Sequence, residues 1–106
     1  MISMKLYLNS RNGTHSATAE YSDNGITVLA GSQINMELLY PKMPPLVREK
    51  RDDRTIVTAD GKLLVDVTFD TPTSAAQFVT GRSVNGYIVW RPDNMMSLKQ
   101  YLEEHS

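Results

Sequence analysis

The chain has no cysteine, only two histidines and almost no net charge. Without cysteine it can form no disulfide and no thiolate metal site, and it offers no thiol nucleophile. The 11 basic and 12 acidic residues give a formal net charge of −1. This balance argues against a dedicated nonspecific DNA-binding protein, because such proteins are usually basic. It leaves room for a local basic patch.

Long hydrophobic runs are also missing. No apolar run approaches the roughly 20 residues that a membrane-spanning helix needs, and the chain starts without an apolar signal segment. We therefore expect a cytoplasmic protein with no membrane partner. The 106 residues are 41% hydrophobic and 22% charged, which is ordinary for a globular protein. We predict a single domain that spans residues 1–106.

The first 30 residues predict a three-stranded meander. Apolar and polar residues alternate in three runs, with the period of a half-buried strand. The runs cover residues 2–9, 16–21 and 26–30. Asn12-Gly13 and Asn24-Gly25 separate them, and this dipeptide favours tight hairpin turns. The small Ala17 and Ala19 indicate that a helix packs closely on one face of the second run.

Prolines interrupt the middle of the chain. Pro45 can open a helix over residues 45–53, with Leu46 and Val47 as its apolar anchors. Strands are expected over residues 34–39, 56–57 and 63–70. Asp60-Gly61 supplies the turn between the last two of these strands.

The block from Phe69 to Trp90 is dense in local signals. Thr71 can cap a helix, Pro72 suits its first position and Gly81 can end it in a left-handed conformation. These residues predict a helix over 72–80. Asn85-Gly86 predicts a tight turn into a strand over residues 87–90.

A last helix is expected over residues 98–104. Ser97 and Gln100 have the spacing of a capping box at its start. Together these signals predict an α+β fold, in which antiparallel β-hairpins or a meander carry two or three short helices packed on the sheet.

The stretch from Pro72 to Trp90 resembles a small domain, itself of unknown function, found at the C-termini of GIY-YIG-type nuclease proteins and of restriction–modification proteins. It is also similar to the RAMA domain, which has been proposed to bind modified DNA. Residues 21–32, which close in Leu-Ala-Gly-Ser, and the tail through Ser97-Leu98 extend the likeness over residues 15–102. Tyr87 stands where a Trp is commoner. The resemblance implies a bacterial accessory domain with a nuclease or methylase partner.

No catalytic constellation is visible in the sequence. His15 is expected at a hairpin shoulder and His105 at the C-terminus, both in solvent. Asp52 and Asp53 belong to a charged run, which is usually a solvated face. We therefore predict no catalytic residue, no metal, no cofactor and no enzymatic activity.

Arg82, Ser83 and Asn85 form the most interesting polar cluster, on a short loop after a predicted helix. An arginine beside a hydroxyl and an amide suits a phosphate or a base edge. The alternative is that Arg82 pairs with a carboxylate while Ser83 and Asn85 bond the loop backbone. Tyr87 is the expected exposed aromatic, and Trp90 is expected in the core. The candidate nucleic-acid-binding residues are Arg82, Ser83, Asn85, Tyr87, Arg91, Arg48 and Arg51.

Two functional hypotheses follow. The first is a non-enzymatic accessory module that binds nucleic acid, modified DNA included, and the case for DNA comes mostly from the resemblance. The alternative is a protein-interaction or homodimerisation module without nucleic-acid binding, which the near-neutral charge favours. Its candidate apolar patch comprises Met36, Leu38, Leu39, Met95 and Met96.

Overall fold

Four antiparallel strands form one sheet. The computed structural model describes residues 4–10, 12–92 and 96–104. The strands are β1 (Met4–Asn9), β2 (Ser16–Ser22), β3 (Gly25–Val28) and β4 (Val67–Phe69), which pair in that order. Both Asn-Gly dipeptides join neighbouring strands, so the predicted meander is confirmed.

The strand register gives the sheet one apolar face. Leu6 lies opposite Ala19, which lies opposite Val28, and all three are fully buried. The other face carries polar residues, among them Thr27 and Thr68, whose hydroxyls lie 2.8 Å apart. The apolar face therefore needs a covering layer, and the polar face does not.

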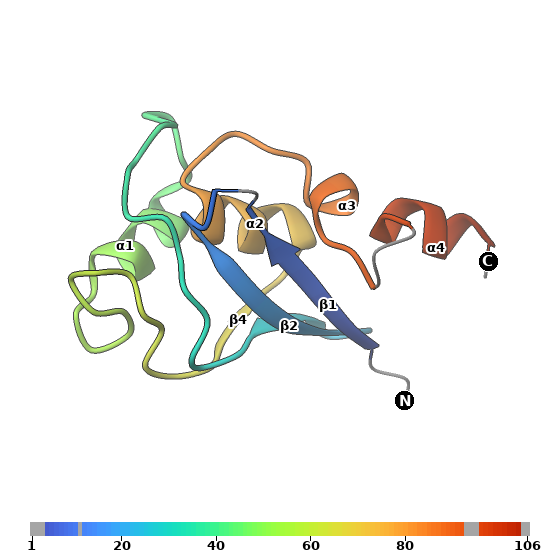
Figure 1. Ribbon diagram of the computed structural model, residues 1–106, viewed down its shortest axis with the longest axis horizontal. Coiled ribbons are helices and arrows are strands. Elements are labelled where there is room, and N and C mark those ends of the chain that lie inside the picture. Colours follow the sequence, from blue (N-terminus) through green and yellow to red (C-terminus); the bar gives the residue numbers. More distant parts are fainter. Residues whose placement is uncertain (1–3, 11, 93–95, 105–106) are drawn as a thin grey trace.

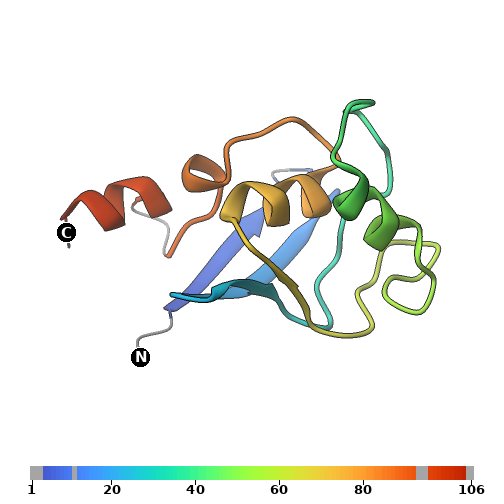
Figure 2. The same ribbon diagram turned by 180° about the vertical axis from the view of Figure 1, so that it is seen from behind.

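Helix α2 provides that layer. The helices are α1 (Pro45–Asp52), α2 (Pro72–Thr80), α3 (Gly86–Val89) and α4 (Leu98–Glu104). Helix α2 lies behind the sheet in Figure 1 and in front of it in Figure 2, with α1 near one end and α3 and α4 toward the other. The small Ala17 and Ala19 on β2 are buried on the covered face, as expected. The α+β fold is confirmed, with four short helices.

Local signals define α2 as predicted. The Thr71 side chain accepts a hydrogen bond from the Ser74 amide at 3.2 Å, and Pro72 opens the helix. Gly81 ends it with a φ of +71°, where its N–H donates to the Gln77 carbonyl. The buried side of α2 includes Phe78, whose ring centroid lies 5.2 Å from that of Phe69. This contact joins the helix to the edge strand β4.

The segment after α2 differs from the prediction. Residues 86–89 form helix α3 rather than a strand, because the Asn85 side chain accepts a hydrogen bond from the Tyr87 amide at 3.0 Å and caps a helical turn. After α3 the chain returns to the sheet at Arg91, whose N–H donates to the Tyr7 carbonyl on β1 and whose carbonyl accepts from the Tyr7 N–H. Trp90 is fully buried, as predicted, and its indole N–H donates to the Pro72 carbonyl at 3.0 Å.

The expected strands in the middle of the chain are mostly absent from the described residues. Residues 34–39 form no strand, although the amides of Ile34, Asn35 and Leu39 donate to the carbonyls of Gly61, Val79 and Gly81. The preceding residue, Gln33, makes isolated bridges to Ser16 and Lys62. Val57 and Leu63 make an isolated bridge, and the predicted 63–70 strand is reduced to β4. Strand β4 begins only at Val67, because the preceding Asp66 is held in a loop, where its carboxylate accepts a hydrogen bond from the Ala30 amide at 2.8 Å.

The C-terminal helix α4 begins at the predicted capping box. The Gln100 amide donates to the Ser97 hydroxyl, and the Ser97 amide donates to the Gln100 side chain at 2.9 Å. Leu98 is buried, and its amide bonds the Trp90 carbonyl at 2.8 Å. Met95 and His105 lie outside the described residues. No helix in the described part of the chain is long and apolar enough to span a membrane.

Candidate ligand pocket

A surface pocket of about 350 Å³ opens between the end of β1 and the segment that contains α3. Its apolar lining comes from Leu8, Val84, Ile88 and Val89. Leu8 belongs to the buried face of β1, whereas Ile88 is 50% exposed. The position of Ile88 depends on α3, because the helical turn capped by Asn85 presents it to the pocket.

Two of the predicted arginines, Arg82 and Arg91, line this pocket. They flank α3 in the sequence, and the backbone of each is fixed. The Arg82 amide donates to the Thr80 hydroxyl at 3.1 Å, and Arg91 exchanges two backbone hydrogen bonds with Tyr7. Arg82 and Arg91 are both exposed to solvent. The pocket therefore combines rigid backbone attachment with two accessible guanidinium groups.

Neither arginine has a carboxylate partner in the described part of the chain, where the recorded ion pair is Lys99–Glu103 at 4.0 Å. No Asp or Glu of residues 4–10, 12–92 and 96–104 lines the pocket either. The alternative prediction that Arg82 pairs with a carboxylate is therefore not met among these residues. An anion that enters the pocket would therefore meet two guanidinium groups that no carboxylate of the described residues neutralises.

His15 contributes to the same wall. His15 was expected in solvent, but the structure shows it partly buried. Burial lowers the pKa of His15 below its usual value of 6.5, and the positive charge of Arg82 lowers it further. Its backbone N–H donates to the Ser10 hydroxyl at 3.1 Å, which holds it at the hairpin end. No local signal marks this residue, because the two arginines of the same pocket lie more than sixty residues away in the sequence.

The other predicted loop residues take different positions. Ser83 is exposed but does not line the pocket, and Asn85 uses its side-chain oxygen to cap α3. Tyr87 is partly buried against the core, so it is not the exposed aromatic that was predicted. Burial raises the pKa of Tyr21 above its usual value, and the neighbouring Tyr87 raises it further.

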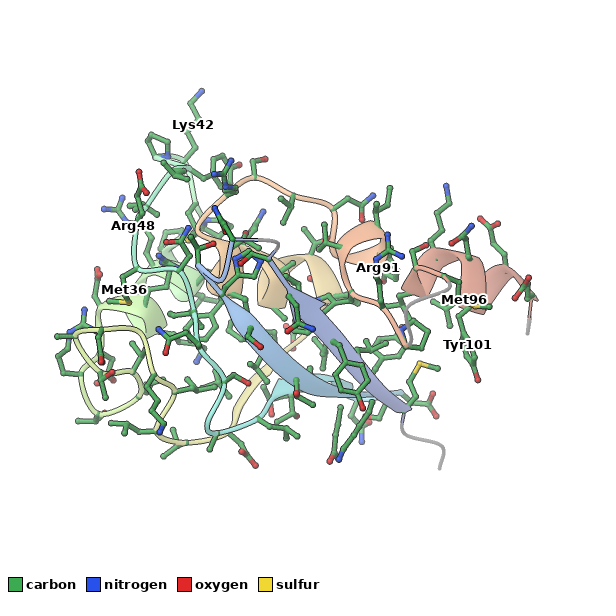
Figure 3. All side chains as sticks on the ribbon, viewed as in Figure 1. Met36, Lys42, Arg48, Arg91, Met96 and Tyr101 are labelled. Carbon is green, nitrogen blue, oxygen red and sulfur yellow. The ribbon has the colours of Figure 1, made fainter. Side chains whose placement is uncertain are left out.

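The basic residues of α1 do not join the pocket. Arg51 is only 4% exposed, so its predicted role as a surface phosphate contact is wrong. Its guanidinium donates to the carbonyls of Phe78 and Asn35, the latter at 2.6 Å. Arg48 is exposed, but Figure 3 shows it toward the α1 side of the molecule, away from Arg91 beside α3.

The described residues contain no group of three His, Asp or Glu side chains that could hold a metal ion. The arrangement is thus a small apolar pocket edged by arginine and histidine, carried by an α+β domain.

The sequence matches the family described as a domain of unknown function (DUF4357) over residues 6–102, and the chain belongs to that family. The match begins before residue 15, where the likeness was expected to start. No curated protein and no solved structure matches the chain.

Proposed function

We propose that this domain is a non-enzymatic accessory module that binds nucleic acid through the pocket between β1 and α3. The observation that carries the proposal is the meeting of Arg82 and Arg91 in one pocket whose described lining residues include no Asp or Glu. Acidic residues outnumber basic ones in the chain as a whole, so the positive charge of the pocket is a local property and does not reflect the overall composition. Arginine is well suited to phosphate because its planar guanidinium can donate two parallel hydrogen bonds.

The biological setting of this proposal is a bacterial nuclease or restriction–modification system in the cytoplasm. The module would act beside a nuclease or methylase partner, and modified DNA is one target to test. Support for this setting is the resemblance of the Pro72 to Trp90 stretch to domains found in such proteins. The pocket itself supports the phosphate chemistry.

The proposal is tested by fluorescence anisotropy with labelled single strands and with plain and base-modified duplexes, at low and at physiological salt. Arg82→Ala and Arg91→Ala should each weaken binding about tenfold, the effect of losing one charge-assisted hydrogen bond. Arg48→Ala is the matched control, since Arg48 is exposed but lies away from the pocket. Absence of binding to every probe at low salt, or equal losses in all three variants, would contradict the proposal.

Protein docking is the second candidate. Leu38, Leu39 and Leu46 remain exposed, and Leu46 is the most exposed of them at 73%. A docking or homodimeric module predicts a molar mass that rises with concentration in light scattering. Leu46→Glu should then return the mass to that of a monomer, and nucleic-acid binding should be absent.

A further inference from the structure

We infer that the pocket accepts one unpaired nucleotide, with its phosphate on Arg82 and Arg91 and its base against the aliphatic lining. This inference deepens the proposed function and rests on it. It names the form of nucleic acid that the site would select, namely an unpaired strand or strand end over an intact duplex.

The size of the pocket limits what can enter it. Its volume of about 350 Å³ lies at the small end of the range of roughly 300–1,000 Å³ that is typical of small-molecule sites. A site of this size holds one monomer unit and cannot embrace a duplex. A duplex would meet it only through the phosphate backbone.

The aliphatic lining favours an unpaired base. In a duplex the faces of the bases are stacked on one another and cannot reach an apolar surface, whereas an unstacked base can place its face against protein side chains. Val84, Ile88 and Val89 offer such a surface next to the arginines. Half of Ile88 is exposed in the free protein, so a bound base would remove this apolar area from water.

The supply of positive charge also matches a single nucleotide. Proteins that follow a duplex contact many phosphates with a continuous basic surface. Among the described residues, the cationic side chains that line the pocket are Arg82, Arg91 and, when protonated, His15. Arg51 is hydrogen-bonded inside the protein and Arg48 lies on the α1 side of the molecule, so these two arginines do not extend the positive charge of the pocket toward α1.

The test compares three probes of equal length with the intact protein: a single strand, the same sequence as a duplex, and a single strand that lacks bases at its central positions. We expect the single strand to bind at least tenfold more tightly than the duplex. The abasic strand should bind about fivefold to tenfold more weakly, because it has no base to cover the apolar lining. This comparison requires no substitution.

A pair of variants tests the lining directly. Ile88→Ser should weaken single-strand binding severalfold and leave duplex binding unchanged. Leu64→Ser is the matched control, because Leu64 is 49% exposed and lies outside the pocket. If duplex binding equals single-strand binding and still depends on Arg82, or if the abasic strand binds as well as the normal one, the inference is overturned while the proposed function stands. Failure of all probes to bind would overturn both.

Discussion

At the scale of the residue, three arginines show how position decides role. Arg51 extends into the interior, where the carbonyl of Phe78 at the end of α2 accepts its hydrogen bond. The C-terminal end of a helix carries partial negative charge, which favours a cation there. Within the described part of the chain, the side chains of Arg82 and Arg91 have no such internal acceptors, and they remain at the surface beside the pocket.

Arg51→Met should therefore destabilise the fold. The substitution keeps the length and apolar stem of the side chain, but it leaves the carbonyls of Phe78 and Asn35 without this donor. We expect a loss of about 2–3 kcal/mol in the free energy of unfolding, measured by urea denaturation. The control is Arg48→Met on the exposed side of the same helix, for which a change within about 0.5 kcal/mol is expected. Equal losses in the two variants would contradict the assigned role of Arg51.

His15 should make stability depend on pH. Its pKa in the folded protein lies below 6.5 because of burial and Arg82, so the unfolded chain binds the proton more readily. The contribution of neutral His15 to the free energy of unfolding is therefore fully present above pH 6.5. It is lost as the pH falls through 6.5 toward the lower pKa of the folded protein. In thermal melts, His15→Gln should show a smaller decrease in melting temperature on acidification than the parent protein. The control His105→Gln should show the same decrease as the parent. A parent-like pH profile for His15→Gln would exclude this origin.

At the scale of the element, α3 is the part of the fold that shapes the pocket. It is only four residues long, and isolated helices of that length do not form in water. Two contacts stabilise it: the Asn85 cap at its start and the hydrogen bond from the Gly86 amide to the Thr73 hydroxyl at 3.1 Å. Its N-terminus is thereby attached to the first turn of α2.

Asn85→Ala should uncap α3 and reduce stability by about 1 kcal/mol. Asn85→Ser should retain most of the parent stability, because a serine hydroxyl can accept the same hydrogen bond from the Tyr87 amide. Urea denaturation of both variants checks this. If nucleic-acid binding survives in Asn85→Ser, the residue acts through the shape of α3; a loss of binding at unchanged stability would instead show that its amide touches the ligand.

Gly86→Ala should separate α3 from α2. A Cβ at this position would lie 2.2 Å from the carbonyl carbon and oxygen of Pro72, and these backbone atoms cannot move aside easily. We expect a loss of about 3 kcal/mol from this overpacking. Gly13→Ala is the comparison: it has open space but a φ of +78°, so only the backbone cost of about 1–2 kcal/mol applies. A smaller loss at Gly86 than at Gly13 in thermal or urea unfolding would contradict the close contact.

At the scale of the whole molecule, the near-zero net charge gives little long-range attraction toward a polyanion. Binding must then depend on contacts made within the pocket. This separates the domain from proteins that hold nucleic acid mainly through their overall charge.

The salt dependence of binding follows from this arrangement. Two arginines neutralise one or two phosphates, so the logarithm of the association constant for a single strand should fall with the logarithm of salt concentration with a slope of about −0.7 to −1.4. Anisotropy titrations over a range of salt concentrations measure it, and Arg82→Ala should bring the slope closer to zero. A slope several times steeper would require a larger basic surface than this pocket provides.

The sequence by itself determined the elements that obey short-range rules. The hairpins follow from alternating runs joined by Asn-Gly turns. Helix α2 follows from Thr71, Pro72 and Gly81, and α4 from the capping box of Ser97 and Gln100. Each of these signals acts over a few neighbouring residues, so no distant contact was needed to interpret it.

Only the tertiary structure decided α3, the burial of Arg51 and the assembly of the pocket. Asn85-Gly86 is compatible with a turn into a strand and with a helix cap, and the contact of Gly86 with α2 favours the cap. The partners of Arg51 lie 27 and 16 residues away. His15 meets Arg82 and Arg91 only because β1 and its hairpin pack beside α3. Contacts between distant segments leave no local pattern. The fold class and two of the arginines in the pocket, Arg82 and Arg91, could therefore be predicted, whereas the pocket itself and the place of His15 in it could not.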